Sequence, residues 1–328
     1  ATRIEARAGG EADVYPEMVA ATCDVIADVA LSGREALDRQ AVTEGISAFI
    51  RNVARLSLLD VIGVPAWVPR PGRLLDRTGP RIDAMMDAII AARRERGPSE
   101  PQDLLDMLLA AEDPETGQRM SDVELRNNLL AFIAAGHETT ALALAWALYL
   151  LAFDSAHGGD VQARARDEAR EAMGDRAAAG AGDVDRLGFV RQVVNEALRL
   201  YPPAGFMTRT ARAHDEIAGH EVRPGTTVIL PVYALHRHER LWARPFAFDP
   251  DRFSREAQGG RHRYAFLPFG AGPRVCLGQQ FALIEAQIIL ATLLARLEFR
   301  LPEGFRPDPR MWFTLRPGTG MPLSVSRV

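Results

Sequence analysis

Hydrophobic side chains recur every three to four positions along most of this chain, which is the pattern of helices that bury one face. Short stretches late in the chain are apolar or alternating and are bounded by turn residues, which predicts strands. The chain is therefore predicted to be mainly α-helical with small β-sheets, in a single domain over residues 1–328. The predicted helices are about Tyr15–Leu31, Ile46–Val61, Pro80–Glu95, Gln102–Ala111, Ser121–Phe153, Val161–Met173, Val184–Leu200 and Gln279–Leu297. The predicted strands are Arg209–Ala213, Glu216–Glu221, Thr226–Pro231 and Leu323–Val325.

Glycine and proline mark where these elements end. A hairpin with its bend at Gly219 is expected around Ile217–Val222. Clusters of the two residues predict loops at Val64–Gly72 and Arg96–Pro101, and Gly174–Gly182 is predicted to be a small-residue loop.

The strongest predicted helix begins at Ser121, where Ser121 and Glu124 form a capping box. It would be about 50 Å long, enough to cross the whole domain. Its middle, Ala135–Thr140, holds a glycine, an acid and two threonines, which are unfavourable inside a helix. Such a conflict often marks a functional site. The alternative is that Thr139 bonds back to a carbonyl and bends the helix.

Composition excludes several classes of protein. A net charge of −4 on 328 residues gives no reason to expect nucleic-acid binding. Two cysteines form neither a disulfide framework nor a zinc site, so a reducing, cytoplasmic setting is expected. The charged start, Ala1–Arg7, contains no signal-peptide core. No membrane span is predicted, because Gly136-His137-Glu138 interrupts the most apolar run, Leu129–Ala152.

The segment Phe269–Gly278 carries the most specific chemistry. Its single cysteine, Cys276, directly precedes a long apolar helix, so the helix N-terminus would stabilise a thiolate. Gly272 and Gly278 let the backbone approach a flat group, and Arg274 can pair with an anion. These features suggest haem with a cysteine axial ligand. The alternative is a buried structural cysteine, which is the interpretation adopted for Cys23.

The pattern Phe-x-x-Gly-x-Arg-x-Cys-x-Gly resembles the haem-binding loop of the cytochrome P450 family, with every fixed position present. The resemblance implies a cytochrome P450 fold, with haem b between the long central helix and the helix after the cysteine. It makes Cys276 the axial ligand of the haem iron. The cofactor-binding residues it implies are Cys276, Arg274, Phe269, Gly270, Gly278, Arg209, Ala135 and Gly136.

The middle of the long helix resembles the family's oxygen-activation motif. By that resemblance Ala135 and Gly136 face the haem and leave room for dioxygen, the co-substrate. Thr139 would hydrogen-bond the dioxygen, and Glu138 would connect it to solvent protons, so these two residues are the predicted catalytic pair. His137 is expected to point away and to be structural.

Glu196 and Arg199 lie on one face of a predicted helix that ends at a double proline. Taken alone, they could be an exposed ion pair of little energetic value. The later run from Trp242 to Phe253 resembles the family's next segment, which makes Arg252 the third member of a buried structural triad with Glu196 and Arg199.

Histidines and arginines elsewhere are weaker candidates. His236 and His238 lack a third ligand, so metal binding is disfavoured and a surface or propionate-side role is expected. The family often places a propionate partner at the position of Arg209, and His262 and Arg263 are further candidates.

The family's N-terminal portion has no counterpart here. Its first sheet, the helices at the pocket entrance and a propionate-binding Trp–Arg pair are missing, and no tryptophan precedes Trp67. Thr43–Ile46 joins two segments abruptly. We therefore expect an incomplete P450 domain, either because the protein is truncated or, the interpretation we favour, because the sequence is part of a longer protein.

The resemblance implies a soluble, bacterial-type haem-thiolate monooxygenase that inserts one atom of O2 into a neutral, largely apolar organic substrate. No nucleotide- or flavin-binding motif is present, so NAD(P)H would act only through a ferredoxin or flavodoxin and its reductase. A peroxide-driven peroxygenase and a non-catalytic haem-thiolate sensor or carrier remain alternatives. The expected substrate-pocket residues are Ala135, Ala204, Gly205, Phe206, Met207, Trp312 and Phe313.

Overall fold

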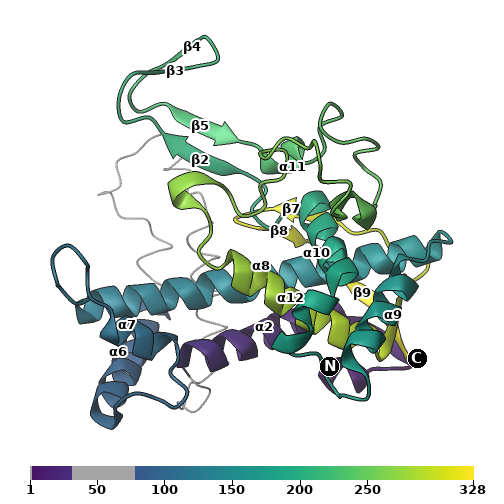
Figure 1. Cartoon of the computed structure of the whole chain (residues 1–328), viewed down its shortest axis with the longest axis horizontal. Coiled ribbons are helices and arrows are strands. Elements are labelled where there is room, and N and C mark those ends of the chain that lie inside the picture. The colour runs from purple at the N-terminus through teal and green to yellow at the C-terminus, as the bar shows by residue number, and fades with distance from the viewer. Residues whose placement is uncertain (1, 32–77) are drawn as a thin grey trace. The chain divides into compact units, whose positions relative to one another are not determined.

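The computed structural model describes residues 2–31 and 78–328 (Figure 1). The predicted helix Ile46–Val61, the loop Val64–Gly72 and the joint Thr43–Ile46 lie outside the described residues. The chain forms two compact units, which we call the large unit (residues 1–18 and 139–328) and the small unit (residues 19–138). The boundaries fall inside two helices, so α2 and α8 each contribute to both units.

Helices dominate the described chain, as the hydrophobic periodicity predicted. The α-helices are α1 (Thr2–Glu5), α2 (Val14–Leu31), α6 (Thr78–Arg96), α7 (Leu104–Ala110), α8 (Asp122–Ala156), α9 (Val161–Met173), α10 (Gly188–Leu200), α11 (Val232–Leu235) and α12 (Gln279–Leu294). The 3-10 helices are η1 (Ala181–Arg186), η2 (Pro250–Phe253) and η3 (Gly272–Arg274).

Within residues 2–31 and 78–328, the paired strands are antiparallel and form one three-stranded sheet and three two-stranded ones. The three-stranded sheet has the order β1 (Gly10–Asp13), β9 (Pro322–Arg327), β6 (Leu297–Arg300). The two-stranded sheets pair β2 (Met207–Thr210) with β5 (Thr227–Leu230), β3 (Asp215–Ile217) with β4 (His220–Val222), and β7 (Pro309–Met311) with β8 (Leu315–Pro317). The β3–β4 hairpin extends beyond the β2–β5 sheet (Figure 1).

The core of the large unit is built around the second half of α8. Every residue from Ala141 to Ala152 is buried, so this part of the helix is surrounded by protein on all sides. Trp146 stacks on Tyr201 with ring centroids 3.9 Å apart, and its indole N–H donates to the carbonyl of Leu315 over 3.2 Å. Among the described helices, α8 alone has the length and hydropathy of a membrane span. Of the 18-residue stretch with that hydropathy, 72% is buried inside the protein.

Helices α9, α10 and α12 pack on one another within the large unit. The predicted helix Val184–Leu200 is interrupted at Leu187, giving η1 and then α10. The break leaves the first amides of α10 without helical acceptors, and the carboxylate of Glu168 on α9 accepts from two of them. Its oxygens lie 2.7 Å from the amide nitrogen of Phe189 and 2.8 Å from that of Val190.

A buried arginine organises the small unit. The Arg93 guanidinium, 3% exposed, donates to the carboxylates of Asp103 and Asp106, each with a contact of 2.8 Å. The same two aspartates form the capping box that starts α7. The ion pairs raise the pKa of Arg93 above its ordinary value, the largest contribution being its hydrogen bond to Asp103. The sequence analysis did not single out this cluster.

Two predictions that depend only on residues close together in the sequence were confirmed. The capping box at Ser121 is present, with its hydroxyl 2.7 Å from the Glu124 carboxylate, and α8 begins one residue later. The hairpin is also confirmed, because Ala218 and Gly219 both have positive φ between β3 and β4. Strands β1, β6, β7 and β8 were not predicted.

Candidate active site

Backbone hydrogen bonds hold the cysteine loop in a compact fold. The amide of Cys276 donates to the carbonyl of Phe269 over 2.9 Å, and the amide of Val275 donates to the carbonyl of Gly272 over 3.0 Å. Gly270 and Gly272 have φ of +75° and +74°, values that side-chain-bearing residues rarely adopt. The loop therefore needs glycine at both positions for its backbone shape.

The thiol of Cys276 is exposed at the start of a helix. Cys276 lies two residues before Gly278, the N-cap of α12. A Cβ at Gly278 would lie 3.9 Å from the sulfur, so glycine leaves this side of the thiol open. Val275 is 40% exposed and Leu277 88% exposed, so the two residues that flank Cys276 in the chain present apolar side chains to solvent.

The Glu196–Arg199 pair lies at the opposite extreme of burial. Both side chains are 0% exposed, and the guanidinium donates to both carboxylate oxygens over 2.7 Å. Its remaining hydrogen bonds go to the backbone carbonyls of His236, Pro245 and Ala247. The guanidinium therefore makes two hydrogen bonds to Glu196 and three to the segment that follows β5.

Arg252 joins this pair. Its Nε lies 3.4 Å from the Glu196 carboxylate, whose same oxygen accepts the amide of Asp249 over 2.9 Å. A second nitrogen of Arg252 donates to the carbonyl of Arg244. The structure therefore brings the three triad residues together around one buried carboxylate.

His236 is not the surface residue that its sequence context suggested. It is 0% exposed, and its ring Nε2 accepts the amide N–H of Leu267 over 2.8 Å. Burial lowers the pKa of His236 to about 4, so the ring is neutral near pH 7. The sequence did not indicate that His236 is buried, because the neighbouring Arg237 and His238 are polar residues typical of a surface segment. No cluster of three metal-ligating side chains occurs within residues 2–31 and 78–328.

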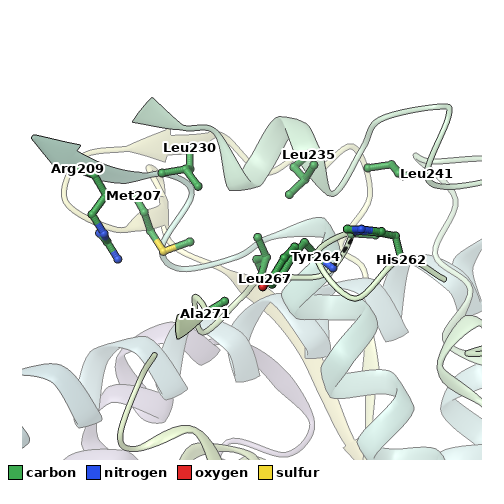
Figure 2. Close-up of a pocket in the computed structure, with 10 residues that line it drawn as sticks. Met207, Arg209, Leu230, Leu235, Leu241, His262, Tyr264, Leu267 and Ala271 are labelled. Carbon is green, nitrogen blue, oxygen red and sulfur yellow. Dashed lines mark hydrogen bonds between the residues drawn. The ribbon is translucent and has the colours of Figure 1, made fainter. Parts of the chain in front are cut away.

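A cavity of about 510 Å³ opens between β2 and the chain that leads to the cysteine. Figure 2 shows Met207 and Arg209 reaching from β2 toward Ala271 in the cysteine loop. The Arg209 guanidinium donates a hydrogen bond to the carbonyl of Thr208 over 2.8 Å. His262, another expected partner of an anion, lines the same cavity. The remaining lining is largely apolar: Met207, Leu230, Leu235, Leu241, Tyr264, Ala265, Leu267 and Ala271.

The motif in the middle of α8 is helical throughout. Ala135 and Thr139 are four residues apart and therefore lie on one face of the helix. A Cβ at Gly136 would approach Ile26 of α2 to 3.2 Å, so close helix packing is a sufficient reason for this glycine. The role expected of Gly136 toward dioxygen stays a prediction. Glu138 is 6% exposed and Thr139 is half-buried.

His137 has the structural environment expected for it. It is 2% exposed, and its Nδ1 lies 2.9 Å from the carbonyl of Ile133 one turn earlier. Its own carbonyl accepts the hydroxyl of Thr22 on α2 over 2.5 Å. The residue therefore anchors α2 on α8 inside the small unit.

Two of the expected pocket segments meet in the large unit. A Cβ at Gly205 would lie only 1.9 Å from the Met311 methyl group, so the two segments are in close contact there. Phe206, Trp312 and Phe313 are 44%, 58% and 63% exposed, respectively. The contact at Gly205 thus brings one expected pocket segment, Ala204–Met207, against the residue that precedes Trp312 and Phe313 in the chain.

Glu285 on α12 is a buried acid that the sequence analysis did not consider. It is 5% exposed, and burial raises its pKa to about 8, opposed in part by the hydroxyl of Thr140 on α8. It lies in α12, a helix whose other residues are mostly apolar. A charged residue within such a stretch was the available signal.

These observations fit a haem. Its iron needs a soft axial ligand that can be deprotonated, which the exposed thiol at the α12 N-terminus provides. Its propionates need cationic partners, and Arg209 lines the adjoining cavity beside Ala271. Its flat face needs apolar contacts, which Val275, Leu277 and the open backbone at Gly278 offer.

The comparison with known families agrees with this fit. The family model for Cytochrome P450 matches residues 1–322. The chain belongs to the cytochrome P450 family. This P450 chain is 35% identical over 308 residues to cyclooctatin synthase of Streptomyces melanosporofaciens, covering 93% of the chain and 66% of that relative. It is 37% identical over 240 residues to cyclooctat-9-en-7-ol 5-monooxygenase of the same organism, covering 73% of the chain and 51% of that relative.

A solved structure extends the likeness to the fold. The haem domain of cytochrome P450DA matches with a TM-score of 0.85 and 29% identity, over 99% of this chain and 70% of that one. The predicted cytochrome P450 fold class is therefore confirmed. The chain spans between about half and two thirds of the length of the two Streptomyces relatives that it matches.

Proposed function

We propose that this P450 chain belongs to a haem-thiolate monooxygenase that inserts one atom of O2 into an organic substrate. The observation that carries the proposal is the exposed Cys276 thiol at the N-terminus of α12, in a loop whose glycines give it a defined backbone shape. The named activity of the relative cyclooctat-9-en-7-ol 5-monooxygenase supports the same reaction class.

Cys276 would hold the iron of haem b, and Arg209 would pair with a propionate. Arg274 is exposed in the same loop and His262 lines the cavity with Arg209, so both are further propionate partners. When bound, the haem supplies the oxygen-activating redox chemistry. The buried triad of Glu196, Arg199 and Arg252 supports the chain segments around the loop and has no chemical step.

The chain's own contribution to oxygen chemistry would come from α8. Oxygen cleavage consumes protons, so the site needs groups that hold and pass them. We assign this role to Thr139 and Glu138, which are adjacent on the helix. Ala135, one turn before Thr139 on the same face, is small enough to leave room for dioxygen.

The substrate we propose is a neutral, largely apolar organic molecule. The two joined pocket segments carry no charged side chain, and Phe206, Met207, Trp312 and Phe313 give them large apolar surfaces. An apolar pocket selects ligands by shape and buried area. Electrons would come from a separate ferredoxin or flavodoxin with its reductase, using NAD(P)H, in the cytoplasm.

The test is the ferrous–CO spectrum of the intact protein, followed by turnover under 18O2. Thiolate ligation gives a strongly red-shifted Soret band, and monooxygenation places one labelled oxygen atom in the product. Product formed from reduced ferredoxin and O2 supports the proposal. Turnover with peroxide alone would indicate a peroxygenase, and ligand binding without turnover would indicate a sensor or carrier.

The proton role has its own test. Thr139→Ala should keep haem and substrate binding but divert electrons from product into peroxide, with a smaller effect for Thr140→Ala. Unchanged coupling in Thr139→Ala would contradict the assignment.

A further inference from the structure

His236 occupies a junction between the buried ion pair and the cysteine loop. Its backbone carbonyl accepts a hydrogen bond from Arg199 over 2.9 Å, while its ring accepts one from the amide of Leu267 over 2.8 Å. Leu267 in turn accepts the amide of Gly270 over 3.2 Å, which closes the turn before the cysteine. One residue therefore connects the most buried charge pair to the segment that carries the thiol.

The His236 ring is enclosed by protein, and among the described residues its other nitrogen, Nδ1, has no hydrogen-bond partner. It is 0% exposed, and its centroid lies 5.2 Å from that of Phe266, which packs into the cluster of Trp242, Phe253 and Ala265. Since Nε2 accepts, the proton of the neutral ring resides on Nδ1. Desolvation keeps the ring neutral by lowering its pKa, opposed in part by the backbone of Arg199 and Leu198.

We propose that His236 is a positioning residue that acts through Nε2, as a neutral hydrogen-bond acceptor that fixes Leu267 and thereby the Cys276 thiolate. The inference rests on the proposed haem-thiolate function. Without the acceptor, the amide of Leu267 would be left unsatisfied near the protein core, which costs more than the bond itself contributes. The turn from Leu267 to Gly270 would then lose its anchor to the Glu196–Arg199 pair.

Two variants separate the acceptor from the ring. His236→Phe keeps the aromatic contact with Phe266 and removes the acceptor, whereas His236→Gln can place an oxygen near the position of Nε2. His238→Phe is the matched control, because His238 is exposed and lies two residues away. The readouts are haem content and the rate at which the ferrous–CO complex loses its thiolate-ligated Soret band.

We expect His236→Phe to accelerate that loss about 10-fold, consistent with an unsatisfied, partly buried amide. We expect His236→Gln to restore most of the difference. Equal losses in both variants, or a wild-type rate in His236→Phe, would overturn the inference. A wild-type protein without the red-shifted band would instead overturn the proposed function, so the two failures are distinguishable.

A measurement on the unaltered protein covers the case in which His236→Phe does not fold. Nitrogen-15 NMR of labelled histidine in the diamagnetic ferrous–CO protein reports which ring nitrogen carries the proton, with His236→Gln assigning the signal. The inference requires the proton on Nδ1 near pH 7. A proton on Nε2 would contradict it, because that nitrogen could no longer accept from Leu267.

Discussion

The buried triad and the cysteine loop differ in almost every physical respect, although both belong to the large unit. Glu196 and Arg199 are completely buried, and every N–H of the Arg199 side chain donates a hydrogen bond. The loop is exposed from Ala271 to Leu277 and is held mainly by its own backbone. We propose that this difference reflects two tasks. The triad stabilises the chain around the site, and the loop carries the Cys276 thiol. Substitutions should therefore affect folding in the first region and ligand chemistry in the second.

The largest expected effect on stability comes from breaking the ion pair. Glu196→Ala leaves the fully buried Arg199 without its carboxylate, which costs about 3–5 kcal/mol. We expect poor folding and little haem incorporation, measured by urea denaturation and haem content.

The control for this change is an ion pair in solvent. Glu112 and Arg119 are 52% and 66% exposed, so Glu112→Ala should leave the free energy of unfolding near its original value. A stable, haem-loaded Glu196→Ala protein would show that the triad is not the scaffold we describe.

Glu285 should give the next largest effect, and its sign depends on pH. The folded carboxyl titrates near pH 8, above the ordinary value of 4.5, so the folded state binds more protons between these values. Stability due to this group is therefore present below pH 4.5 and is lost as the pH rises to 8. The pKa difference corresponds to a loss of stability of at most about 5 kcal/mol. Because the buried site can relax, we expect a loss of about 2–3 kcal/mol.

Glu285→Gln should remove that loss and raise the free energy of unfolding at pH 9 relative to the unaltered protein. Exposed Glu303→Gln is the control and should leave the pH profile in place. Parallel stability profiles for Glu285→Gln and the unaltered protein between pH 5 and 9 would contradict the raised pKa.

A smaller loss of stability is expected from a substitution at Gly205, where the chain contacts Met311. Gly205→Ala would force the Met311 side chain aside at a cost of about 1 kcal/mol, because its methyl group is flexible. The displaced side chain should change the substrate-induced spin shift. The double variant with Met311→Ala should recover the stability, and failure of that recovery would place the strain elsewhere.

The smallest change in stability should come from the residue with the most chemistry. Cys276→Ala removes an exposed side chain, so the free energy of unfolding of the haem-free protein should change by about 0.5 kcal/mol or less. The red-shifted ferrous–CO band should vanish completely.

Cys23→Ala is the matched control, since that cysteine is buried in α2. It should cost about 1 kcal/mol and leave the band intact. A band that survives Cys276→Ala would remove the axial-ligand assignment.

Local patterns were sufficient for some elements and uninformative for others. The capping box at Ser121 and the bend at Gly219 were predictable because each depends on residues within four positions of one another. The sheet β1–β9–β6 was not, since it pairs Gly10 with Val325 and no short-range pattern records such a partner. The interruption at Leu187 likewise depends on Glu168 from the preceding helix.

The same division holds for the site. The order of the residues around Cys276 was enough to predict a haem-thiolate loop, because the chemistry needs a thiol, small residues and a helix start within ten positions. The burial of Glu196, Glu285 and His236 was decided only by tertiary structure. Whether a polar side chain is buried depends on segments that are distant in the sequence and pack against it. Such packing buries the Glu196–Arg199 ion pair and makes His236 a buried hydrogen-bond acceptor.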